Sequence, residues 1–72
     1  MLNNDKIPLT PKQLKVYSFI LTEFQEKGFI PTYQEIAEKF GTDRAGIARY
    51  LKRIEGRGWI KTNTAPRAIQ IL

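Results

Sequence analysis

The segment 28–41 constrains the fold of this chain more than any other part of the sequence. Thr32 is a favoured N-cap residue, and Glu35 follows three positions later, which is the spacing of a capping box. Apolar residues then recur at helical spacing as far as Phe40. Gly41 permits the tight turn that a residue with a Cβ would resist. The segment therefore predicts a short helix over residues 33–40 followed at once by a turn, as in a helix-turn-helix.

A longer helix is predicted before this segment. Thr10 followed by Pro11 is a strong start signal, and the helix runs to about Lys27 and stops at Gly28. Its apolar residues recur at i, i+3, i+7 and i+10, so we expect one buried stripe. The stripe comprises Leu14, Tyr17, Leu21 and Phe24, with Ile20 beside them.

A third helix and a hairpin follow. The helix begins near Thr42 or Asp43, runs to about Arg57, and gathers its apolar residues Ile47, Leu51 and Ile54 on one side. Residues 59–62 and 67–72 are predicted strands joined by a turn at 63–66. The fold class is therefore mainly α with a small β-hairpin: a winged helix-turn-helix of three helices and a two-stranded wing. We expect a flexible N-terminal arm over residues 1–9 and this domain over residues 10–72.

Composition excludes several function classes. The chain has 72 residues and neither cysteine nor histidine, which rules out disulfides and the metal sites those residues build. No apolar run approaches the roughly 20 residues of a membrane span, and no signal peptide is apparent at the N-terminus. Ser18 has no catalytic partner in sight. We therefore expect a cytoplasmic protein that needs no cofactor and is not an enzyme.

Charge is distributed unevenly along the chain. Residues 1–43 carry five lysines against six acidic residues, a net charge of −1. Residues 44–72 carry seven basic residues against Glu55 alone, a net charge of +6. A basic half that follows a turn motif is typical of a phosphate-binding surface, although a solvated face explains the asymmetry equally well.

At this point the chain resembles the N-terminal DNA-binding domain of LexA-type repressors. The match extends from Leu9 to Leu72, and it is the order and spacing of its pieces that make it specific. The pieces are Leu9-Thr10-Pro11-Lys12-Gln13, Gly28-Phe29-Ile30-Pro31-Thr32, Glu35-Ile36-Ala37, Leu51 with Gly58 and Ile60, and Pro66-Arg67-Ala68-Ile69-Gln70-Ile71-Leu72. The resemblance implies a bacterial or phage-type transcriptional repressor, associated with the nucleoid, that binds operator DNA through the third helix and braces itself with the wing.

Two departures limit this resemblance. The segment 41–51 is one residue shorter than in typical family members, and the third helix carries basic and small residues where the family usually presents small polar and acidic ones. The resemblance therefore implies affinity for DNA but not the identity of the operator. Family repressors also continue into a self-cleaving peptidase domain that dimerises them. This chain has no such segment, so it is either a stand-alone binder or an excised domain.

Candidate DNA contacts follow from the third helix and its neighbours. Arg49 and Lys52 point away from the apolar stripe, Arg53 flanks them, and arginine can bind guanine O6 and N7 together. Small residues allow close approach to the groove floor, although Gly46 costs about 1 kcal/mol relative to alanine in a helix. Trp59 is expected to pack on the first helix rather than to stack on a base. The predicted DNA-binding residues are Tyr33, Arg44, Ala45, Gly46, Ala48, Arg49, Lys52, Arg53, Asn63, Thr64 and Arg67.

The sequence thus favours a regulator, most simply a repressor, that reads double-stranded DNA through the major groove. We expect a monomer in solution and two copies paired on a palindromic operator. Two other interpretations stay open. The chain is a winged-helix adaptor that binds another protein, such as a repressor or polymerase, or it is the DNA-binding half of a self-cleaving repressor.

Overall fold

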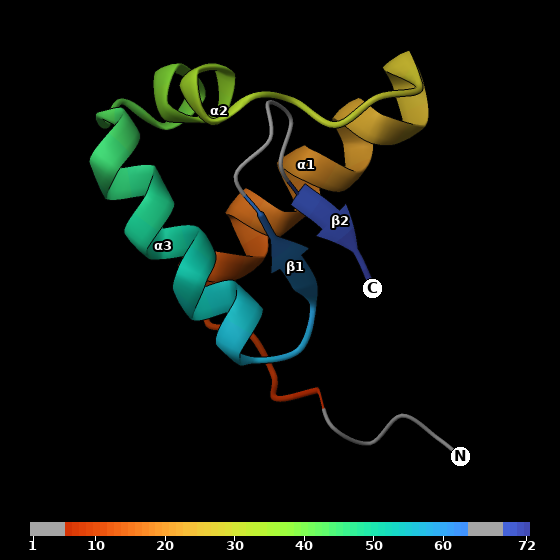
Figure 1. The fold of residues 1–72 in the computed structure, drawn as a ribbon, viewed down its shortest axis with the longest axis vertical. Helices are drawn as coiled ribbons and strands as arrows, with labels where there is room; N and C mark the ends of the chain where they lie inside the picture. The colour runs from red at the N-terminus through yellow and green to blue at the C-terminus, as the bar shows by residue number, and fades with distance from the viewer. Residues whose placement is uncertain (1–5, 64–68) are drawn as a thin grey trace.

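The elements follow one another in the predicted order. The computed structural model describes residues 6–63 and 69–72, which form α1 (Pro11–Lys27), α2 (Tyr33–Phe40), α3 (Arg44–Gly56), β1 (Ile60–Thr62) and β2 (Ile69–Ile71). Figure 1 shows α3 running beside β1, with the two strands paired next to it and α1 behind. This arrangement is consistent with a winged helix-turn-helix, and it confirms the predicted fold class.

Local capping explains where the helices begin. The hydroxyls of Thr10 and Thr32 accept hydrogen bonds from the backbone N–H groups of Gln13 and Glu35, and the side chains of those two residues reach back to the threonine N–H groups. Both capping boxes are therefore complete. For α3 the N-cap is Asp43 rather than Thr42, because its carboxylate accepts from Gly46 N at 2.7 Å. A single side chain thus decides between the two candidates.

Left-handed glycines end the first two helices. Gly28 has φ of 81° after α1 and Gly41 has φ of 69° after α2, a conformation in which a side chain would be strained. The Gly41 turn sends the chain directly from α2 into α3, as the sequence predicts.

The hairpin is antiparallel and short. Ile60 pairs with Ile71, Lys61 with Gln70 and Thr62 with Ile69. Leu72 N–H extends the pairing by donating to Trp59 O at 3.1 Å. The predicted wing is therefore present. β1 begins one residue later than predicted, and residues 67 and 68 of the second predicted strand lie outside the described residues.

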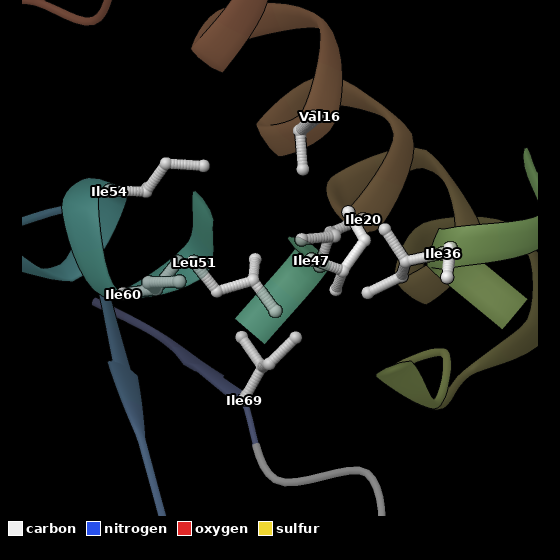
Figure 2. Packing of buried hydrophobic residues seen from close by; sticks show 9 residues of the cluster. Val16, Ile20, Ile36, Ile47, Leu51, Ile54, Ile60 and Ile69 are labelled. Atoms are coloured by element: carbon white, nitrogen blue, oxygen red, sulfur yellow. The ribbon is translucent and has the colours of Figure 1, made fainter. Parts of the chain in front are cut away.

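One apolar cluster holds all five elements together. Figure 2 shows its side chains converging from α1, α2, α3 and both strands. In α3, Ile47, Leu51 and Ile54 are buried as predicted. The whole cluster comprises Val16, Ile20, Ile36, Ala37, Ile47, Leu51, Ile54, Ile60 and Ile69.

The predicted buried stripe of α1 is partly wrong. Leu14 is 49% exposed and Phe24 is 43% exposed, whereas Tyr17 and Leu21 are half-buried. Ile20 is buried as predicted, and it enters the core together with Gln13 and Val16, which the predicted stripe did not include. The physical reason is that α1 carries apolar residues around much of its circumference, and α2 and α3 cover only one side of it. Gln13 is buried because its side chain serves the capping box.

The segment just before α1 is attached to the far end of α3. Ile7 N–H donates to Arg57 O at 2.9 Å, and the indole N–H of Trp59 donates to Ile7 O at 2.7 Å. The Arg57 guanidinium donates to Pro8 O, and the Lys6 ammonium lies 4.7 Å from the centroid of the Trp59 ring. Part of the expected N-terminal arm is therefore held against the domain, while the division of the chain at residue 10 stays a prediction.

Candidate nucleic-acid interface

The outer face of α3 carries exposed basic side chains. Arg49, Lys52 and Arg53 are all exposed, and they lie opposite the buried Ile47, Leu51 and Ile54. A helix with one face in the core must present the other to solvent, so these cations reach any surface that approaches α3. Ala45 is also exposed on this side, which leaves room for close approach near the start of the helix.

A shallow hollow collects five predicted residues from α2, α3 and the position after β1. Its lining comes from the first residue of α2, the middle of α3, and the end of β1 with the residue that follows it. Because α2 and β1 lie on the same flank of α3, side chains far apart in the sequence meet here. The lining residues are Tyr33, Ala48, Arg49, Lys52, Thr62 and Asn63. Of these, Thr62 alone is not among the predicted contacts.

Two predicted residues lie toward the opposite flank of α3. Gly46 lines a cleft between α3 and the start of α1, and the helical positions place Arg53 on the same flank. The cleft also contains Lys12, Lys15 and Tyr50, to which sequence reasoning assigned no function. The i, i+3 spacing of Lys12 and Lys15 places both on one face of α1, which is the sequence signal that could have paired them. That spacing does not reveal that the start of α1 lies beside α3.

The start of α3 is organised by Asp43. Its carboxylate already satisfies Gly46 N–H, so one of the amides that a phosphate would use is occupied. Arg44 is exposed beside it and remains free to approach a phosphate by its side chain. A Cβ at Gly46 would lie 2.6 Å from Thr42 Oγ1, so a larger residue there would require the exposed Thr42 side chain to move.

The last residue of β1 is joined to α3 through Glu55. Thr62 N–H donates to Glu55 Oε2 at 3.1 Å, and the Thr62 hydroxyl donates to Glu55 Oε1 at 2.8 Å. Lys52 Nζ lies 3.4 Å from the same Oε1. The backbone N–H of Thr62, then its hydroxyl, and the nearby Lys52 ammonium hold the pKa of the Glu55 carboxyl below its ordinary value. Asn63 follows Thr62 and is exposed, whereas Thr64 and Arg67 lie outside the described residues.

Trp59 packs on α1, as predicted. Its ring meets that of Tyr17 edge to face, with centroids 5.4 Å apart. Since the indole N–H is also bonded to Ile7 O, this side chain is committed to the fold.

The described residues offer neither a metal site nor a membrane-spanning helix. Within 6–63 and 69–72 there is no group of three or more acidic side chains arranged to hold a metal ion. None of the helices described there has both the length and the apolar character to cross a bilayer. The geometry is therefore that of an open, basic, helix-centred surface.

Comparison with known proteins agrees with this geometry. Residues 6–68 match the family described as the LexA DNA binding domain. The LexA repressor of Syntrophotalea carbinolica is 44% identical over 66 residues, which cover 89% of this chain and 33% of that protein. The LexA repressors of Leptospira interrogans serovar Lai and Listeria welshimeri are 42% and 39% identical, each over 89% of this chain and 32% of its own length. The chain thus spans about a third of the length of these relatives, and it belongs to the LexA DNA-binding domain family.

Proposed function

We propose that this chain binds double-stranded DNA in a sequence-dependent way, as the DNA-binding part of a transcriptional repressor. One observation carries the proposal. In a member of the LexA DNA-binding domain family, Arg49 and Lys52 are exposed on α3 directly opposite its buried face, and they share a hollow with Tyr33 and Asn63. An α-helix fits the major groove, so this face is the one that meets the bases.

The residues divide into two roles under this proposal. Arg49 reads base edges, because a guanidinium can bind guanine O6 and N7 together. Ala45 and Ala48 let the helix approach the groove, and an alanine methyl can contact the thymine methyl. The others position the domain through phosphates or the edge of the minor groove. They are Tyr33, Arg44, Lys52, Arg53, Asn63, Thr64 and Arg67, while Gly46 acts through its lack of a side chain.

We further infer that two copies bind one palindromic operator in the bacterial cytoplasm. A single α3 covers only a half-site, and two-fold symmetric proteins use half-sites spaced by about one helical turn of DNA or a multiple of it. The apolar residues of α3 and both strands are used within the domain's own core, which favours a monomer before DNA is met. The role assigned to the chain is binding rather than catalysis.

Selection of bound sequences from random double-stranded DNA tests the proposal directly. A recurrent motif with two-fold symmetry is expected, together with binding that weakens steeply as salt rises. A flat salt titration with no preferred sequence would favour the protein-adaptor hypothesis instead.

Sedimentation of the protein at micromolar concentration tests the pairing. We expect a monomer alone and a two-to-one complex on the selected palindrome. A stable dimer without DNA, formed for example through the edge of β2, would refute the monomer, and a one-to-one complex would refute pairing.

A further inference from the structure

Glu55 is the one acidic residue in the basic half of the chain, and its position is costly. It lies in the last turn of α3, where a negative charge opposes the helix dipole. Glu55 also lies beside Lys52, on the face proposed to contact phosphates, and its carboxylate repels those phosphates. A side chain with two electrostatic disadvantages calls for a compensating contact, and the structure contains one.

The compensating contact joins α3 to the wing. The two Glu55 oxygens accept the N–H and the hydroxyl of Thr62, at 3.1 and 2.8 Å, and Lys52 Nζ approaches one of them to 3.4 Å. Thr62 is the last residue of β1, immediately before the turn of the hairpin. One carboxylate on α3 therefore contacts both Lys52 of the same helix and the last residue of β1.

Within the described residues, the wing is held on two sides. A hairpin of two three-residue strands is marginal by itself, so its orientation depends on what it packs against. Ile60 and Ile69 anchor it to the core on one side. The hydrogen bonds from Thr62 to Glu55 fix it to α3 on the other side, where Asn63 lines the same hollow as Arg49.

We propose that Glu55 is a positioning residue for DNA binding. It fixes the orientation of the wing relative to α3, the helix proposed to read the DNA, and it holds the Lys52 side chain in place on that helix. The inference rests on the proposed function, because it concerns how two DNA-contacting parts act together. Glu55 itself touches no DNA. Its effect passes through Thr62 and Lys52, so that α3 and the wing meet one duplex as a single rigid surface.

Removing Glu55 has two opposing effects that must be separated. Loss of the negative charge favours binding to phosphates, whereas loss of the hydrogen bonds between Thr62 and Glu55 weakens the contacts that the wing makes with DNA. Glu55→Gln removes the charge but keeps a carbonyl that can accept from Thr62. Glu55→Ala removes both. At Thr62, Thr62→Val deletes the hydroxyl and Thr62→Ser keeps it, which gives a matched pair that leaves Glu55 in place.

A double-mutant cycle on DNA affinity tests the proposal. Asn63→Ala should weaken binding of the selected site in the wild type. In the Glu55→Ala and Thr62→Val backgrounds the same change should cause at most half that fold-loss. In the Glu55→Gln and Thr62→Ser backgrounds most of it should remain. An equal fold-loss in all backgrounds, or none in the wild type, would overturn the proposal, because the wing would then not depend on Glu55 for its contact.

Amide hydrogen exchange of the protein without DNA gives an independent readout. The Thr62 N–H should exchange several-fold faster in Glu55→Ala than in the wild type, while amides in the middle of α1 keep their protection. If Thr62 exchanges faster in Glu55→Ala but the wild type selects no DNA motif, the contact between Glu55 and Thr62 holds the wing but the proposed function fails. If the DNA motif is found but Thr62 exchange is unchanged, the proposed function stands and the inference about Glu55 fails.

Discussion

α1 and α3 are both amphipathic helices, yet they divide their faces differently. In α3 the apolar residues Ile47, Leu51 and Ile54 are all buried, and the opposite face is exposed and basic. In α1 apolar residues lie on several sides, and Leu14 and Phe24 are left about half exposed. The difference shows that the buried face of a helix can be predicted from its sequence only when polar residues occupy the rest of its circumference. α3 is therefore oriented by its own sequence, while α1 is oriented by its neighbours.

The largest expected effect is the contrast between two leucine truncations. Leu51 is fully buried in α3, so Leu51→Ala should cost about 2–5 kcal/mol of unfolding free energy through lost contacts and a cavity. A domain of this size has only a few kcal/mol in total, so the variant should be largely unfolded. Leu14→Ala on α1 is the matched control, and it should shift stability by no more than about 0.5 kcal/mol. Urea unfolding followed by circular dichroism measures both, and similar costs would contradict the difference between the helices.

The next effect concerns the outer faces of the same two helices. Arg49→Ala on α3 should weaken binding to the selected site by about 1–3 kcal/mol and relax the preference at one base pair, since a bidentate base contact is lost. Lys27→Ala on α1 removes one cation, paired with Glu23 at 2.8 Å, and should leave the preferred sequence unchanged. Site selection and titration on both variants provide the measurement. An Arg49→Ala variant that selects the wild-type motif would exclude α3 as the recognition helix in the proposed register.

A smaller and sequence-independent effect is expected from the wing. We expect Lys61, which is exposed in β1, and Arg67 to contact phosphates, so Lys61→Ala or Arg67→Ala should lower affinity for all DNA sequences alike. The slope of log affinity against log salt should become shallower by about one for each contact. Titrations at several salt concentrations, on the selected site and on a scrambled one, test this. A change in preferred sequence would instead give the wing a direct role in reading bases.

The smallest effect is on the acid limit of stability. The hydrogen bonds from Thr62 lower the pKa of Glu55 below its ordinary value of 4.5 in the folded state, so the unfolded chain binds this proton more readily. The stabilisation is thus fully present above the unfolded pKa and is lost as the pH falls through the folded pKa. Unfolding at several pH values between about 6 and 3 should show a shallower acid dependence for Glu55→Gln than for the wild type. The acid dependence of the unfolding free energy for Thr62→Val should fall between those of the wild type and Glu55→Gln. An identical acid dependence in all three proteins would show that the hydrogen bonds from Thr62 do not stabilise the charged carboxylate.

Features built from neighbouring residues were predictable. The helix starts at Thr10 and Thr32 and the left-handed turns at Gly28 and Gly41 follow from chemistry within three or four positions. The hairpin was predictable from two segments of mostly alternating apolar and polar residues on either side of a turn-forming segment. The exposed basic face of α3 follows from helical period alone. Which of those residues meet DNA remains a prediction, because exposure makes a contact possible without specifying it.

Features that depend on distant parts of the chain required the tertiary structure. The sequence by itself determined where α1 and α2 begin and which face of α3 turns outward, because capping and periodicity are local. Only the tertiary structure decided that Gln13 enters the core while Leu14 does not, and that Ile7 bonds to Arg57 and Trp59. It also decided that the single acid of the basic half accepts from Thr62. These contacts arise because a small core can cover only one side of α1, and because the chain turns back after α3 so that β1 packs against that helix.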